Sequence, residues 1–245
     1  MFSLEERSAA RDRILTMASA DTRIVAGAVV GSFASGTADR WSDLDLAFAV
    51  ADDVAVGDVL ADWTLQLATS LGAVGILDLP VGTSIYRVFL LQGALQVDLS
   101  FTPARQFRPA GPAFALLFGE SGKPAYRASP PPRHFFGLGT LHAMHARTSL
   151  ERGRQWRAEH SITGIRECAL SLVCIQRGLE PFDGRGFDDL PADILVPFIG
   201  TLAGSVQPLD LRRALSTAVD LLLAASADVP DLASEVETRL RTLVI

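Results

Sequence analysis

Two aspartates at the start of a predicted strand are the side chains in this sequence best suited to bind metal ions. Asp43 and Asp45 are separated by one leucine and open the apolar run Leu44–Val50. Because successive side chains of a strand point to opposite faces, both carboxylates are expected on one face. Carboxylates about 7 Å apart along a strand can bridge two divalent cations that lie about 3.5–4 Å apart. The pair therefore predicts metal-assisted chemistry.

A glycine-containing turn lies just upstream of the aspartates. Gly31 and Ser32 follow the apolar run Ile24–Val30, and Gly36 comes shortly after them. This pattern predicts a strand, a tight turn and the start of a short helix. Backbone N–H groups, a hydroxyl and the positive end of a helix dipole favour a bound phosphate at such a turn. A phosphate seat followed by paired carboxylates predicts nucleotidyl transfer assisted by metal ions.

A two-cation site needs a third carboxylate, because two aspartates supply too few oxygen ligands. Asp98 is the candidate, since it is an isolated charge among the apolar residues of the predicted strand 95–101. A buried charge without a partner is costly, and a cation would account for it. The alternative is an edge strand on which Asp98 faces solvent together with Gln96 and Ser100, which alternate with apolar residues.

The composition argues against several classes of function. The 245 residues carry a net charge of −6, Lys123 is the only lysine, and the arginines form no run. Proteins that grip a long nucleic acid usually present a basic face, so we expect no nucleic-acid partner and a small or cationic acceptor. The start of the sequence lacks the layout of a signal peptide, and no apolar run approaches the roughly 20 residues that span a bilayer. We therefore expect a cytoplasmic protein without a membrane partner.

Periodicity and turn residues predict two differently built halves. Ser3 and Glu6 form a capping box that opens a first helix, and a second helix is predicted at 54–71. Strands are predicted at 24–30, 44–50, 74–79, 84–91 and 95–101. A Pro- and Gly-rich stretch follows at 102–132, and helices are predicted at 135–178, 191–202, 209–225 and 232–243. The expected fold class is α+β, with an α/β domain at 1–120, a connector at 121–132 and an all-α domain at 133–245.

The turn, the aspartate pair and the later aspartate together resemble the signature of the DNA polymerase beta-like nucleotidyltransferase superfamily. The match covers residues 31–46 closely and the later aspartate more loosely. Within the superfamily, a small α/β domain followed by a helical bundle is similar to bacterial nucleotidyltransferases that modify aminoglycosides or lincosamides. This resemblance implies a mixed sheet with flanking helices. The residues that carry it are Gly31-Ser32, Gly36, Ser42-Asp43-Leu44-Asp45 and Asp98.

The resemblance also implies roles for single residues. Gly31 and Ser32 would hold the terminal phosphates of ATP or another nucleoside triphosphate. Asp43 and Asp45 would bind two Mg²⁺ ions. Asp98 would complete the metal site on the acceptor side and lower the pKa of the attacking hydroxyl, directly or as a base. The reaction would be an in-line attack on the α-phosphate that releases pyrophosphate.

Four further residues are candidates with open alternatives. Arg40 and Ser42 flank the site and could contact phosphate, but each is at least as well explained by a surface or turn-capping role. In related antibiotic-modifying enzymes a glutamate of the helical half acts as the base, and Glu159, or Glu151, would take that part here. A structural ion pair between helices is the alternative. The general base is therefore Asp98 or a helical glutamate.

Together these inferences predict a Mg²⁺-dependent nucleotidyltransferase that moves a nucleoside monophosphate, AMP before others, onto a hydroxyl of a small molecule such as an aminoglycoside or lincosamide. Protein or toxin side chains are the second acceptor class, because minimal members of the superfamily adenylylate proteins. A third hypothesis is a catalytically silent nucleotide-binding regulator, against which three metal-ligating aspartates argue. The segment 182–189 could offer carboxylates to a cationic ligand or form a solvated helix entry. Whether the chain forms a homodimer is open.

Overall fold

The computed structural model describes residues 1–126 and 129–244. The chain divides into two compact units, Met1–Ala128 and Ser129–Ile245, and each is described by itself. Arg127 and Ala128 of the predicted connector, and Ile245 of the predicted helical domain, lie outside the described residues. Within the described ranges, every helix is too short or too polar to cross a bilayer.

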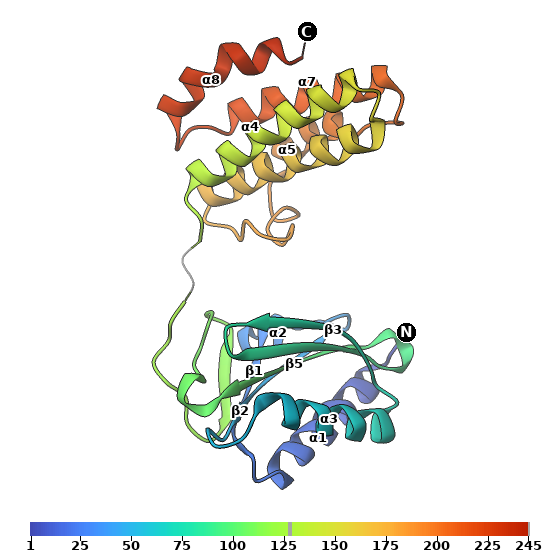
Figure 1. Ribbon diagram of the computed structural model, residues 1–245, viewed down its shortest axis with the longest axis vertical. Coiled ribbons are helices and arrows are strands. Elements are labelled where there is room, and N and C mark those ends of the chain that lie inside the picture. Colours follow the sequence, from blue (N-terminus) through green and yellow to red (C-terminus); the bar gives the residue numbers. More distant parts are fainter. Residues whose placement is uncertain (127–128, 245) are drawn as a thin grey trace. The chain divides into compact units, whose positions relative to one another are not determined.

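The first unit is built on a six-stranded mixed sheet with the order β3-β4-β5-β2-β1-β6 (Figure 1). In this described sheet β2 and β5 pair in parallel, and the other neighbours pair antiparallel. A mixed sheet with flanking helices, followed by a helical unit, confirms the predicted α+β fold class. The strands are β1 (Ile24–Val30), β2 (Leu44–Val50), β3 (Val74–Val81), β4 (Ser84–Leu90), β5 (Gln96–Pro103) and β6 (Phe114–Phe118).

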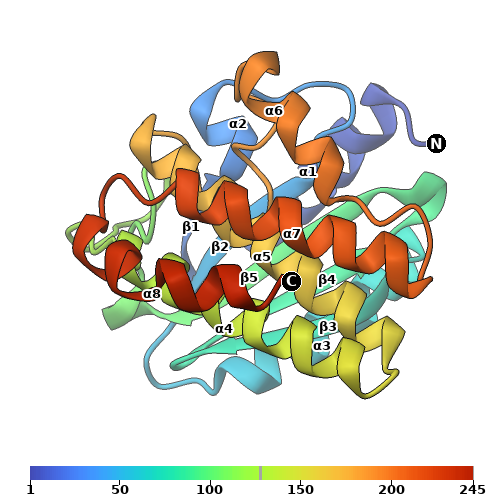
Figure 2. The same ribbon diagram turned by 90° about the horizontal axis from the view of Figure 1, so that it is seen from above.

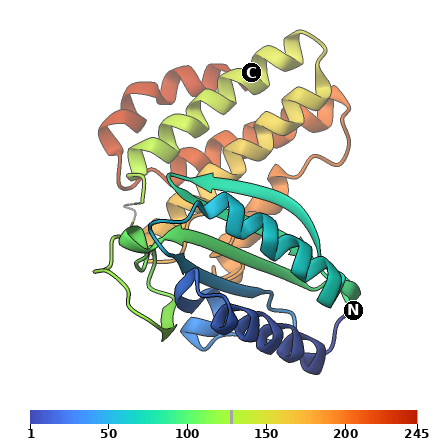
Figure 3. The same cartoon turned by 60° about the horizontal axis from the view of Figure 1, so that its bottom comes forward.

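Two helices, α1 (Leu4–Ala20) and α3 (Val56–Leu71), cover one face of the sheet (Figures 1 and 3). The predicted capping box is present at the start of α1, where Ser3 and Glu6 exchange hydrogen bonds. The core between helices and sheet centres on Trp63 of α3, whose ring lies 5.1 Å from those of Phe48 and Phe101. Burial of such side chains contributes about 1.5–3 kcal/mol each, which anchors β2 and β5 against α3.

The stretch 102–132 contains a strand that the sequence pattern does not predict. Strand β6 pairs antiparallel with β1, with Val30 opposite Phe114 and Val29 opposite Ala115. The segment is too short for its periodicity to predict a strand. It forms one because its backbone N–H and C=O groups pair with the free edge of β1. Two single-turn 3₁₀ helices, Gln92–Ala94 and Ala104–Gln106, flank β5.

The second unit is a helical bundle in which α4 (Pro132–Glu151), α5 (Gln155–Gln176) and α7 (Pro208–Ala224) pack side by side (Figure 2). Shorter helices α6 (Ala192–Phe198) and α8 (Pro230–Thr242) and the 3₁₀ turn Ile199–Thr201 complete it. The stretch predicted as helix almost throughout, 135–178, is helical up to Gln176 except for a short break that divides it into α4 and α5. The chain reverses between α4 and α5 at Gly153, whose φ of 64° is left-handed, and the return lets two amphipathic faces bury one another.

Candidate active site

The pairing of β2 with β5 brings the three predicted aspartates together. Asp45 is the second residue of β2 and lies directly opposite Asp98 of β5 in the parallel register, while Asp43 immediately precedes β2. Each of the three half-buried side chains offers a carboxylate oxygen within 4.8 Å of the others. β2, the residue before it and β5 thus form one carboxylate cluster, defined here as Asp43, Asp45 and Asp98.

Strand alternation places this cluster on the sheet face opposite α1 and α3. Leu44 and Leu46 point into the core beneath those helices, so Asp45 between them points to the other face. On β5 the same argument applies to Asp98, because Val97 and Leu99 are fully buried in that core. The edge-strand alternative for Asp98 is wrong, since β5 lies inside the sheet between β4 and β2.

The three carboxylates of the cluster lie close enough to repel one another. Burial, with a further contribution from the nearby Asp43 carboxylate, raises the pKa of Asp98 above its usual range, against the opposing effect of a hydrogen bond from Gln96. The Gln96 amide nitrogen lies 3.1 Å from both oxygens of Asp98 and 3.4 Å from an oxygen of Asp43. Three oxygen-donor side chains converging on one point are the ligand set that Mg²⁺ or Mn²⁺ prefers.

The turn after β1 fits a phosphate in part. Helix α2 (Gly31–Ser35) begins at Gly31, whose φ of 66° is left-handed, and a Cβ there would overlap an oxygen of Asp45. Glycine is therefore needed for the turn to approach the carboxylate cluster. The buried hydroxyl of Ser32 has no hydrogen-bond partner among the described residues, which fits a polar ligand at this place. The N–H of Gly31 already donates to the Ala113 carbonyl at 3.2 Å, so it does not face a ligand.

The other two residues predicted to flank a nucleotide make local contacts. The hydroxyl of Ser42 donates to the carboxylate of Asp39 and accepts from the Asp39 N–H, at 3.1 and 2.9 Å, and these bonds close the turn before β2. The guanidinium of Arg40 stacks on the ring of Trp41 at 4.3 Å. Both residues stabilise the segment that leads into Asp43.

Arg7 of α1 is a residue of this region that the sequence analysis does not single out. Its side chain is only 8% exposed, and it donates to the carbonyls of Asp39 and Ser42 at 2.7 and 2.8 Å. Its guanidinium also lies 4.7 Å from the ring centre of Phe33 in α2. One buried cation thus ties the turn before Asp43 to the helix that carries Ser32. A sequence signal exists, because Arg7 is in helical phase with the buried Ala10 and Ile14.

Glu159 lies in α5 of the helical unit and is half-buried. Its carboxylate accepts a hydrogen bond from the Thr163 hydroxyl at 3.0 Å, and Arg166 donates to the same hydroxyl at 3.0 Å. Spacings of four and three residues place these side chains on one face of α5. Glu151, the other candidate base, forms ion pairs of 3.0 and 3.1 Å with Arg147 and Arg212. Such ion pairing is the structural role that the sequence analysis gives as the alternative to a base.

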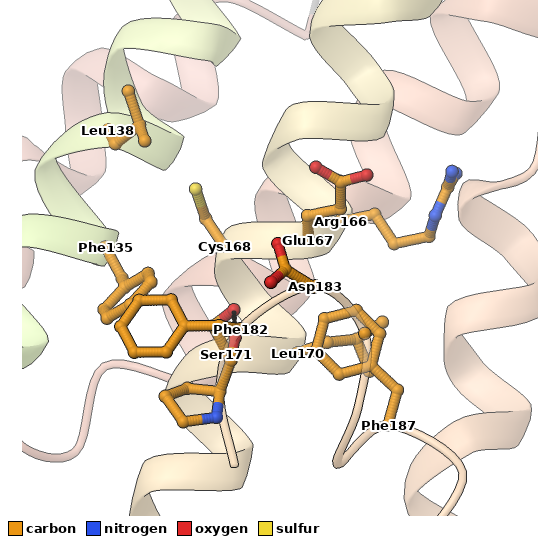
Figure 4. A pocket seen from close by; sticks show the side chains of 12 residues that line it. Phe135, Leu138, Arg166, Glu167, Cys168, Leu170, Ser171, Phe182, Asp183 and Phe187 are labelled. Carbon is orange, nitrogen blue, oxygen red and sulfur yellow. Dashed lines mark hydrogen bonds between the residues drawn. The ribbon is translucent and has the colours of Figure 1, made fainter. Parts of the chain in front are cut away.

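The helical unit contains a cavity of about 590 Å³ between α4, α5 and the loop that follows α5 (Figure 4). The rings of Phe135 and Phe182 lie side by side at its wall, 5.8 Å apart. Two carboxylates, Glu167 and Asp183, also line it, and among the described residues neither has a hydrogen bond or ion pair. Arg166 lines the cavity but is tied to Thr163. Aromatic walls with unpaired carboxylates suit a small cationic or hydroxyl-bearing molecule.

Comparison with known proteins adds a distant likeness. No protein-family model matches the chain, and no curated protein matches it. Among solved structures, the chain is similar to the crystal structure of an aminoglycoside 6-adenyltransferase from Bacillus subtilis. The identity is 13% and the TM-score 0.36, over 96% of this chain and 97% of that chain.

Proposed function

We propose that this chain is a metal-dependent nucleotidyltransferase that transfers a nucleoside monophosphate, AMP from ATP in the first instance, to a hydroxyl group. The observation that carries the proposal is the carboxylate cluster, in which Asp45 and Asp98 face each other and Asp43 adjoins them. The buried hydroxyl of Ser32 on the neighbouring helix, which has no hydrogen-bond partner within 1–126 and 129–244, supports a phosphate beside this cluster. Three converging carboxylates beside the Gly31 turn are hard to explain by folding alone.

Asp43, Asp45 and Asp98 would hold two Mg²⁺ ions, and bound Mg²⁺ would supply Lewis-acid stabilisation of charge on the α-phosphate. Asp98 is the first choice to accept the proton of the attacking hydroxyl, because its carboxylate lies in the cluster directly opposite Asp45. Glu159 is the second choice for the base, since its carboxylate already accepts a hydrogen bond from Thr163. Ser32 would donate its hydroxyl to the terminal phosphates.

For the acceptor we propose a small hydroxyl-bearing molecule of the aminoglycoside or lincosamide kind. The cavity of the helical unit supports this choice, because its volume lies within the range of small-molecule sites, about 300–1,000 Å³, and two carboxylates line it beside phenylalanine rings. A net charge of −6 also favours a cationic acceptor over a nucleic acid. We further propose that the protein works in the cytoplasm, where ATP and Mg²⁺ are present.

The test is to incubate the purified chain with each nucleoside triphosphate, Mg²⁺ and a panel of aminoglycosides and lincosamides. Pyrophosphate release and the mass of the modified acceptor are measured. Asp45→Asn and Asp98→Asn should abolish pyrophosphate release while circular dichroism stays unchanged. Asp53→Asn is the matched control, because Asp53 is exposed in the loop after β2. Retained activity in the Asp45 variant would overturn the metal assignment.

The same assay separates the alternatives. Labelled nucleotide appearing on a co-purified or added protein, with no small molecule modified, would assign a protein acceptor. Tight ATP binding without turnover on any acceptor would assign a nucleotide-binding regulator. A Glu159→Gln variant distinguishes the two bases, because loss of the base lowers kcat at unchanged KM.

A further inference from the structure

The side-chain amide of Gln96 donates hydrogen bonds to two carboxylates of the cluster. It is the first residue of β5, and Asp98 follows it on the same face of the strand. Its amide nitrogen lies 3.1 Å from each oxygen of Asp98 and 3.4 Å from Asp43 Oδ2. One NH₂ group therefore approaches three oxygens of two carboxylates that come from different parts of the chain.

The position of this amide nitrogen is the position that a cation would need. A divalent cation shared by Asp43 and Asp98 must approach the same oxygens, and the amide nitrogen, equidistant from both oxygens of Asp98, lies where a cation bound to both of those oxygens would lie. The NH₂ group is the positive end of the amide dipole, so it partly offsets the repulsion between the carboxylates. The amide and the cation cannot both occupy this place.

We infer that Gln96 closes the cation site in the cation-free protein, and that cation binding requires its amide to leave Asp98 and Asp43. This inference rests on the proposed metal site, and it means that Gln96 sets how tightly that site binds a cation. The side chain is exposed, so it can rotate toward solvent without disturbing the core. An arginine or lysine here would hold the carboxylates permanently, whereas a neutral amide yields to a divalent charge.

The experiment is a Mn²⁺ titration followed by electron paramagnetic resonance, which reports free Mn²⁺ and needs no turnover. Gln96→Leu removes both amide N–H donors and keeps a side chain of similar size. Mn²⁺ should therefore bind about tenfold more tightly, a factor that corresponds to the net free energy of hydrogen bonds to a charged group. Gln96→Lys places a full positive charge among the carboxylates and should abolish Mn²⁺ binding. Gln66→Leu on α3, which contacts none of the three aspartates, is the matched control and should bind like the parent chain.

Thermal unfolding gives a second readout. Without divalent cation, Gln96→Leu should unfold at a lower temperature than the parent chain because the carboxylates lose their hydrogen-bond donor, and saturating Mn²⁺ should remove the difference. In the parent chain, the side-chain amide resonances of Gln96 should shift on titration with Mg²⁺.

The outcomes separate this inference from the proposed function. Equal or weaker Mn²⁺ binding by Gln96→Leu, with clear binding by the parent chain, overturns the role of Gln96 and leaves the metal site standing. Absence of Mn²⁺ binding in both folded proteins overturns the metal site and this inference together. Tighter binding by the leucine variant and none by the lysine variant supports both.

Discussion

Asp45 and Asp98 face each other across the parallel strands β2 and β5, although 53 positions separate them in the chain. Like charges at directly opposed positions of a sheet destabilise it. The repulsion between the two carboxylates therefore costs stability, and the Gln96 amide that contacts Asp98 offsets it in part. A site whose ligands repel one another in the empty state is typical of a binding function rather than of a structural one.

Removal of one of these charges should stabilise the cation-free protein. We expect Asp98→Asn to raise the free energy of unfolding in EDTA by about 0.5–1 kcal/mol, because asparagine keeps an acceptor for Gln96 without the buried charge. Urea unfolding measures this change. The exposed Asp53→Asn should change the value by less than about 0.5 kcal/mol. A less stable Asp98 variant would mean that the carboxylate has a favourable partner in the folded state.

Cation binding should weaken with acid earlier than for an ordinary carboxylate site. The pKa of Asp98 is raised, chiefly by burial and further by Asp43, so the folded chain holds this proton more tightly than the unfolded chain. The stability of the cation-free protein therefore falls as pH rises from the unfolded to the folded pKa, and Mn²⁺ affinity falls as pH drops through the folded value. Mn²⁺ titrations from pH 7 to pH 4 measure the second effect. If Mn²⁺ affinity falls with pH no more steeply in the parent chain than in Asp98→Asn, the predicted role of the Asp98 proton is wrong.

A methyl group at Gly31 should damage the site, whereas one at Gly36 should not. Both glycines have a left-handed φ, 66° and 73°, so alanine costs about 1–2 kcal/mol of stability at either position. A Cβ at Gly31 would in addition press on Asp45, with its Cγ at 3.2 Å, while no atom of the described residues lies within 4 Å of a Cβ at Gly36. Gly31→Ala should therefore lose Mn²⁺ binding and Gly36→Ala should keep it. Equal Mn²⁺ affinity in the two variants would exclude close packing of the turn on Asp45.

Replacement of Arg7 should loosen the segment before Asp43. Arg7→Met leaves the carbonyls of Asp39 and Ser42 without their donor, and we expect a loss of about 1.5–3 kcal/mol in the free energy of unfolding. Arg11→Met on α1 is the matched control, because Arg11 is partly exposed and pairs with Asp12, and such a pair contributes about 0–1 kcal/mol. Hydrogen exchange of the 39–42 turn should rise in the Arg7 variant alone.

Two glycines of the bundle should respond to alanine with opposite signs. A Cβ at Gly164 of α5 would lie 2.7–2.8 Å from the ring of His142 on α4, whereas a Cβ at Gly137 of α4 meets nothing within 4 Å. Gly164→Ala should destabilise by about 1–3 kcal/mol through overpacking. Gly137→Ala should stabilise by up to about 1 kcal/mol, because alanine favours a helix. Thermal unfolding decides both, and a stabilised Gly164 variant would show that α4 and α5 can separate at no cost.

Local pattern was sufficient to predict the elements whose signal is short-range. The capping box of Ser3 and Glu6, the strand–turn–helix around Gly31 and the common face of Asp43 and Asp45 follow from alternation, helix phase and backbone chemistry within a few residues. The break at Gly153 and strand β6 were not predictable in this way. Both depend on a partner distant in the chain. Packing of α5 on α4 stabilises the break, and pairing with β1 stabilises β6, although periodicity alone favours neither conformation.

The amino-acid order by itself determined which side chains could bind metal and which face of its strand the aspartate pair takes, because strand alternation is a local property of the backbone. Only the tertiary structure decided that Asp98 stands opposite Asp45, that Gln96 lies between Asp98 and Asp43, and that Arg7 holds the turn before them. The reason is that strand register and helix docking depend on the packing of Trp63, Phe48 and Phe101, a contact between segments far apart in the chain.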